Sequence, residues 1–226
     1  LSLHDALPIS RHAPPLNAAD LLRGYAGILG SRPFLGYSLS GGLAMAGLFA
    51  YIAGSPFVLI QLGGIPATDF GWVFGANALG FVAASQLNAR ALSKHEPSRL
   101  LRYALWLPAL SGGGLALWLG FAEFELAPLL LGLFLYVSSL GFIVPNASAN
   151  ALATHGQQAG SASALLGALQ FGLATLAGIG VSQLHDGSAM PLALLLALCG
   201  CGAWFTHRWL VRPHAARPSS PRHRSS

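Results

Sequence analysis

Side chains that could act as nucleophiles, bases or metal ligands lie outside the interiors of the long apolar stretches. All eight histidines fall in connecting segments, near the chain ends or at the edge of an apolar stretch, so none could activate a serine inside one. The two cysteines, Cys199 and Cys201, are two residues apart and would point in nearly opposite directions on a helix, so they cannot bind one metal ion together. The sequence therefore favours a protein that is not an enzyme and carries no metal or cofactor.

Polar residues of another kind stand inside the apolar stretches, and the clearest group is VPNASANA at 144–151. Pro145 has no N–H, so the carbonyl of Gly141 loses its helical partner and the helix can bend there. Asn146 would place a polar group beside that bend. One interpretation is a bendable helix lining a water-filled path, and the other is a helix end whose amides reach the membrane surface.

Similar polar and small residues recur at helical spacing in the other stretches. The candidate substrate-pathway residues are Tyr51, Ser55, Asn77, Tyr136, Asn146 and Gln170. The candidate bending residues are Pro56 and Pro145. A stripe of small residues predicted to pack helices together comprises Gly160, Ser163, Gly167, Ala174 and Gly178. For Gln170 a plain hydrogen bond to a neighbouring helix is the alternative to a place in a cavity.

The elements that carry these residues follow from the composition. Of the 226 residues, 54% are hydrophobic and 8% are charged, far fewer charges than a water-soluble domain carries. Six apolar stretches approach the length that a helix needs to cross a membrane, at 38–60, 70–89, 102–121, 127–150, 159–183 and 188–210. The sequence therefore predicts an all-α membrane protein with six transmembrane helices.

Charged residues predict how these helices are oriented. The twelve Lys and Arg residues occur before the first stretch, between the second and third, and after the sixth. The connections on the opposite side contain Asp69, Glu123, Glu125 and Asp186 instead. By the positive-inside rule, both termini are expected in the cytoplasm. The net charge of +5 is interpreted as a topology signal with contacts to lipid headgroups, and not as a nucleic-acid surface.

Four segments are expected along the chain. Residues 1–13 show no helical periodicity and are interpreted as a foreign or disordered leader. Residues 14–37 form a linker and a short amphipathic helix on the membrane surface. Residues 38–210 form the six-helix bundle, and residues 211–226, rich in Arg, Pro, Ser and His, form a disordered basic tail.

Four pieces of the sequence together resemble a known family. YIAGSPFV (51–58), FGWVFGANALGF (70–81), VPNASANALA (144–153) and AGSASALLGALQF (159–171) are similar, in this order, to the second half of the Bcr/CflA (bicyclomycin-resistance) drug transporters of the major facilitator superfamily. The resemblance implies a twelve-helix fold of which this chain supplies helices seven to twelve. Residues 14–37 would then end the central cytoplasmic loop.

The same resemblance implies a function. It indicates a multidrug efflux protein of the bacterial inner membrane, an antiporter that exchanges protons for amphiphilic drugs and confers antibiotic resistance. The missing N-terminal half would be its partner and would hold the proton-coupling residues. Two alternatives stay open: a sugar or metabolite exporter of the same superfamily, and a self-contained six-helix scaffold or channel.

Overall fold

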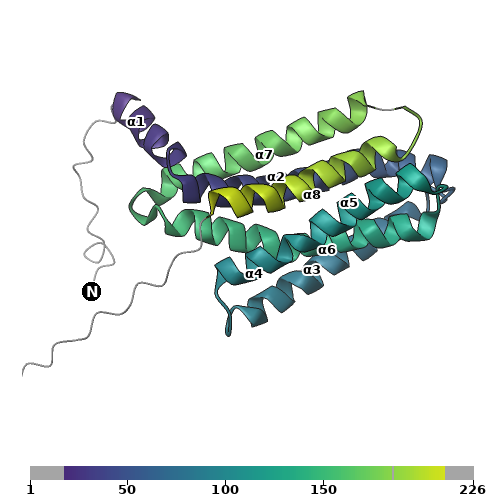
Figure 1. The fold of residues 1–226 in the computed structure, drawn as a ribbon, viewed down its shortest axis with the longest axis horizontal. Coiled ribbons are helices and arrows are strands. Elements are labelled where there is room, and N and C mark those ends of the chain that lie inside the picture. The colour runs from purple at the N-terminus through teal and green to yellow at the C-terminus, as the bar shows by residue number, and fades with distance from the viewer. Residues whose placement is uncertain (1–17, 185, 212–226) are drawn as a thin grey trace, which may run out of the picture.

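A computed structural model describes residues 18–184 and 186–211, which form helices and connecting turns with no strand among them (Figure 1). The expected leader and all but the first residue of the expected tail fall outside these ranges. In chain order the elements are α1 (Ala18–Leu29), α2 (Arg32–Pro56), the π-helix η2 (Phe57–Leu62), α3 (Phe70–Ala91), α4 (Pro97–Ala104), α5 (Trp106–Phe121), α6 (Leu126–Ala153), the 3-10 turn η3 (Gly156–Gln158), α7 (Ala159–Gln183) and α8 (Met190–Leu210).

The six predicted membrane spans are confirmed as helices. Six helical segments are long and apolar enough to cross a membrane, and each overlaps one predicted stretch. The first begins at Arg32, earlier than the predicted position 38, because Pro33 suits the first turn of a helix and Phe34 is already fully buried. The amphipathic segment before it contains α1, whose Ile28 is buried.

Two prolines change the helix geometry. Within the third span, α4 ends at Ala104 and α5 begins at Trp106. Pro108 explains this break, because it cannot donate to the carbonyl of Ala104 and its ring crowds that carbonyl. After Pro56 the first span continues as the π-helix η2, in which the N–H of Gly63 donates to the carbonyl of Val58 at 2.9 Å.

The helices pack in a symmetric pattern. The long helix α2 packs against α6, α7 and α8, and α6 packs against α2, α3, α4 and α5. Exchanging α2 with α6, α3 with α7, and α4–α5 with α8 leaves the principal pairings unchanged. Figure 1 shows α3 and α7 on opposite sides of the bundle. The chain is therefore built from two three-helix units around the central pair α2 and α6.

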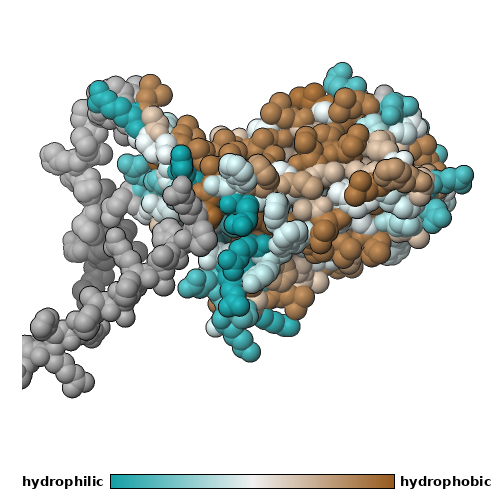
Figure 2. Space-filling view, in the orientation of Figure 1, coloured by the Kyte–Doolittle hydropathy of each residue, from teal (hydrophilic) through white to brown (hydrophobic). Residues whose placement is uncertain are grey.

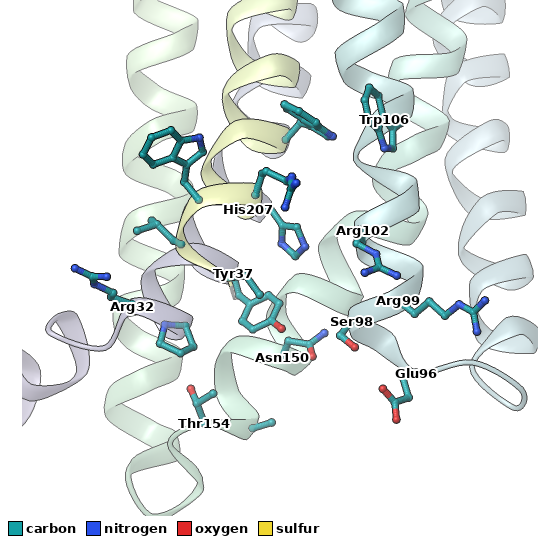
Figure 3. Close-up of a pocket in the computed structure, with 17 residues that line it drawn as sticks. Arg32, Tyr37, Glu96, Ser98, Arg99, Arg102, Trp106, Asn150, Thr154 and His207 are labelled. Atoms are coloured by element: carbon teal, nitrogen blue, oxygen red, sulfur yellow. The ribbon is translucent and has the colours of Figure 1, made fainter. Parts of the chain in front are cut away.

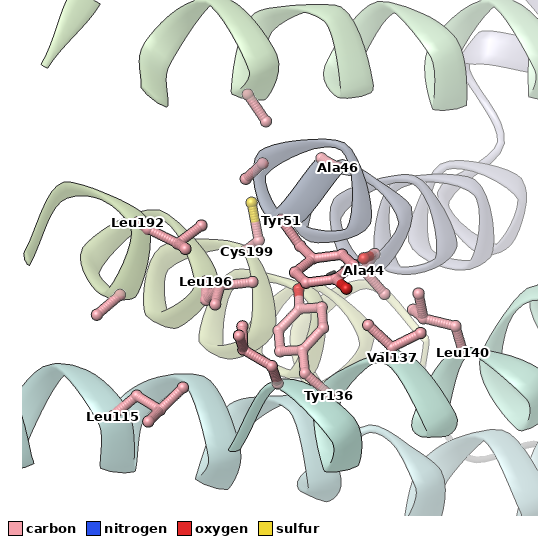
Figure 4. Close-up of a cluster of buried hydrophobic side chains, with 14 of the residues drawn as sticks. Ala44, Ala46, Tyr51, Leu115, Tyr136, Val137, Leu140, Leu192, Leu196 and Cys199 are labelled. Carbon is pink, nitrogen blue, oxygen red and sulfur yellow. Dashed lines mark hydrogen bonds between the residues drawn. The ribbon is translucent and has the colours of Figure 1, made fainter. Parts of the chain in front are cut away.

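Glycines allow the central and outer helices to approach closely. A Cβ at Gly47 of α2 would collide with the Tyr136 hydroxyl of α6, and Figure 4 shows this tyrosine ring extending from α6 toward α2. On the outer side, a Cβ at Gly112 of α5 would lie 2.6 Å from the Leu196 carbonyl oxygen of α8. Because no hydrophobic effect drives helices together in lipid, such close packing supplies much of the association energy.

The sides of the bundle are apolar. Figure 2 shows hydrophobic residues over most of the visible sides and hydrophilic residues toward the ends. Large apolar side chains stand exposed, among them Trp72 at 81% and Phe121 at 90% of their surface. An apolar surface of this extent suits a hydrocarbon environment and not water. The chain is a multi-pass membrane protein.

Candidate functional site

The first polar contact between spans joins α2 to α3. Asn77 of α3 donates from its amide nitrogen to the Tyr51 hydroxyl of α2 at 2.8 Å, and both side chains are buried. The Tyr51 ring stacks on Phe74, with ring centroids 5.7 Å apart. The structure thus brings together two of the predicted pathway residues.

A second contact joins α6 to α3 near VPNASANA. The Asn146 amide donates to the side-chain oxygen of Asn88 at 2.7 Å and to the Phe142 carbonyl, also at 2.7 Å. Both asparagines are at most 2% exposed. The sequence did not single out Asn88, which lies near the end of its span. Asn88 follows Ala84 by four residues and Asn77 by eleven, so all three lie on the buried face of α3. This spacing is the signal that could have revealed Asn88.

Tyr136 sits at the centre of the bundle. It is fully buried, and its hydroxyl donates to the Ala44 carbonyl of α2 at 3.4 Å. Figure 4 shows it among the side chains of α2, α6 and α8, with Tyr51 and Cys199 nearby. In this conformation Tyr51, Tyr136 and Asn146 present almost no surface, so their place in a substrate pathway stays a prediction.

Two further predicted pathway residues are buried and carry a polar atom without a hydrogen bond of good geometry. The Gln170 amide nitrogen lies where α7 meets Gly41 and Gly42 of α2, and it has no partner within the described residues. Ser55 is fully buried, and its hydroxyl makes no hydrogen bond of good geometry within the described residues, although it interacts with the Tyr51 hydroxyl. An unsatisfied buried polar group costs about 1 to 3 kcal/mol. These groups keep free hydrogen-bonding capacity inside the bundle.

The side chains of the two predicted bending residues face away from the interior of the helix bundle. Pro145 is exposed, and α6 runs unbroken from Leu126 to Ala153. Gly141, whose carbonyl Pro145 cannot serve, approaches α3 so closely that a Cβ there would lie 2.6 Å from the Phe81 carbonyl oxygen. Pro56 is also exposed and marks the change from α-helix to π-helix. Bending at either proline stays a prediction.

The small-residue stripe of α7 faces mostly away from the other described helices. Cβ atoms added at its three glycines would meet nothing within 4 Å, and Ser163 is exposed. Ala174, by contrast, is 1% exposed and packs inside the bundle. Within the described residues, the glycines of α2 that approach α7 most closely are Gly42, beside Leu173, and Gly54, beside Val181. Packing of the stripe against another part of the protein stays a prediction.

A large groove opens at one end of the bundle. We call this end the basic end. It comprises the first turn of α2, α4 with the segment before it, and the last turn of α8. The groove has a volume of about 1050 Å³. Figure 3 shows Arg32, Arg99, Arg102 and His207 around it, together with residues from the end of α6. None of the predicted site residues lines it. The sequence treated His207 only as a residue at the end of a span.

Comparison with known proteins finds relatives named for drug resistance and for transport. No protein-family model matches it. It is 29% identical, over 82% of its length, to a bicyclomycin resistance protein homolog of Haemophilus influenzae, and 29% identical over 91% to the uncharacterized MFS-type transporter YdgK of Bacillus subtilis. It is also 27% identical over 92% to the multidrug resistance protein MdtM of Escherichia coli O157:H7. The chain is thus similar, along most of its length, to proteins named for drug resistance and to one named as an MFS-type transporter.

The extent of these matches bears on the fold. The matched regions cover 46%, 51% and 52% of the three relatives, so the chain spans about half the length of each. Together with the six spans, this confirms the expected half of a twelve-helix major facilitator fold. The two three-helix units agree with the repeats nested inside each half of that fold. YdgK is named as a transporter and the other two relatives are named for drug resistance, which agrees with the expectation that the chain is not an enzyme.

Proposed function

We propose that this chain is the C-terminal half of a multidrug efflux transporter of the bacterial inner membrane, exporting amphiphilic molecules in exchange for protons. The observation that carries this proposal is the match along 82% of the chain to a relative named for bicyclomycin resistance. The relative named as multidrug resistance protein MdtM supports it over 92% of the chain.

The proposed partner is an N-terminal six-helix half, because the relatives are about twice as long as the matched region. Among the six spans of the half described here, those of α3 and α7 have the smallest buried share in their most apolar stretch, 11% and 17%. We infer that their exposed faces meet the other half and border the cavity between the two halves, where substrates of such transporters bind.

We infer that the residues that carry protons lie in the other half. The six described spans contain no Asp or Glu, and His207 is their one histidine. A carboxylate is the usual proton carrier of a transporter helix. The polar residues of this half would supply neutral hydrogen-bonding groups instead: Tyr51, Asn77 and Asn146 through their existing bonds, and Gln170 and Ser55 through their free capacity.

Drug accumulation in cells tests this proposal. The full-length protein that carries this chain would be expressed in a bacterial strain deleted for its own efflux pumps, and intracellular ethidium would be followed by fluorescence. The proposal expects lower accumulation than in the empty-vector strain, restored to the control level by a protonophore. Equal ethidium accumulation in both strains, despite membrane insertion, would contradict it. Export of a sugar or metabolite alone would favour the alternative exporter.

A further inference from the structure

The groove at the basic end carries an uncompensated positive charge. Arg32, Arg99, Arg102 and Arg208 line it, and Glu96 is the one carboxylate among its lining residues. No ion pair joins these guanidinium groups to a carboxylate within the described residues. Figure 3 shows Arg99 and Arg102 projecting from one side and Arg32 from the other. Four cations facing one anion favour a negatively charged ligand.

His207 gives independent evidence for a ligand. Its side chain lines the groove yet is only 7% exposed, and its Nδ1 atom has no hydrogen-bond partner within the described residues. Figure 3 shows the ring directed into the space between Tyr37 and Arg102. The ring centroids of Tyr37 and His207 are 5.8 Å apart, so the two rings pack against each other. An unpartnered polar atom on a residue that lines a groove leaves hydrogen-bonding capacity that a bound group can complete.

The surroundings of the groove indicate that this group comes from a lipid. The groove lies where α8 ends at Leu210 and where the third span begins at Pro97, so it stands at the level of a membrane surface. Trp106 and Trp204 line it with ring centroids 4.8 Å apart, and Trp209 on its rim is 71% exposed. Tryptophan gathers at the headgroup level of membranes, where one edge of the ring is apolar and the other is hydrated.

We propose that this groove binds the phosphate-bearing headgroup of an anionic phospholipid. The phosphate oxygens accept hydrogen bonds from the guanidinium groups of Arg99 and Arg102, and a headgroup oxygen pairs with His207. The acyl chains lie outside against the exposed tryptophans. Basic pockets between transmembrane helices are known to suit such headgroups. This proposal is independent of the transported substrate.

Native mass spectrometry tests the proposal directly. The full 226-residue chain in a mild detergent would be mixed with equal amounts of phosphatidylglycerol and phosphatidylcholine, and retained lipid would be counted by mass. We expect preferential retention of phosphatidylglycerol. In R99Q/R102Q its apparent affinity should fall about tenfold, since each basic residue near an anionic lipid contributes appreciably. His207→Phe, which keeps an aromatic ring and removes both nitrogens, should also weaken retention.

The matched control is R90Q/K94Q. It removes two charges from exposed residues near the same end of the bundle, but neither residue lines the groove. This variant should retain phosphatidylglycerol as the unmodified chain does. Equal losses in the two double variants, or no preference in the unmodified chain, would overturn the site. Displacement by soluble glycerol 3-phosphate without any lipid preference would overturn the lipid assignment.

Discussion

At the scale of single residues, paired amides and hydroxyls hold the spans together. The Asn146 amide of α6 donates to the Asn88 side-chain oxygen of α3 at 2.7 Å, and the Asn77 amide of α3 donates to the Tyr51 hydroxyl of α2. The sequence identified Asn146, Asn77 and Tyr51 because each interrupts an apolar stretch. It could not show that they turn toward one another, because pairing across helices depends on rotation and register that hydropathy does not encode.

The asparagine pair makes a testable prediction about coupling. Asn146→Leu leaves Asn88 buried without a partner, whereas N88L/N146L removes both polar groups. The double variant should therefore lose less stability than the sum of the single variants, with a coupling of about 0.6 to 1.7 kcal/mol. Thermal unfolding in detergent would measure the stability of Asn146→Leu, Asn88→Leu and the double variant. Additive losses would show that the two amides do not interact.

The close approach of Tyr136 to Gly47 predicts that a larger side chain at position 47 destabilises the protein. A methyl group at this position would collide with the Tyr136 hydroxyl, so Gly47→Ala should cost about 1 to 3 kcal/mol of stability. Gly172→Ala is the matched control, because a Cβ at Gly172 meets nothing within 4 Å and alanine favours a helix. Unfolding temperatures in the same detergent decide the point. A Gly47→Ala protein as stable as Gly172→Ala would contradict the close approach of α2 and α6.

At the scale of elements, the helices carry geometry that hydropathy alone misses. The six spans follow from long apolar stretches, and the sequence predicted their number and approximate limits correctly. It missed the separation of α4 from α5, although Pro108 and its lost partner at Ala104 carry that signal. It also missed the groove, because Arg32, Arg102, Asn150 and His207 are far apart in sequence and meet only in the folded bundle.

The proline of α6 makes a prediction about transport. Pro145→Ala would give the Gly141 carbonyl its helical partner and stiffen α6, so we expect slower turnover with nearly unchanged drug affinity. Pro128→Ala is the control on the same helix, since residue 128 lies in the first turn, where an N–H has no helical acceptor. Efflux rate and drug binding would be measured in the full-length protein at matched expression. Unmodified turnover in Pro145→Ala would mean that the proline has no gating role.

At the scale of the whole molecule, charge predicts orientation. Cysteines introduced singly at positions 67, 124 and 187, in a background without Cys199 and Cys201, should react with an impermeant maleimide added outside intact cells. A cysteine at position 95 should react only after the cells are permeabilised, because the basic residues near it favour the cytoplasm. Labelling of position 95 from outside would reverse the proposed topology.

The central claim is that this chain works as one half of a transporter whose site lies between two halves. Proton-driven ethidium transport into inverted membrane vesicles tests it, with the 226-residue chain expressed alone or together with the six-helix half that completes its full-length protein. We expect no transport by the chain alone and transport when both halves are present. Equal transport in the two preparations, at matched amounts of the chain, would contradict the account.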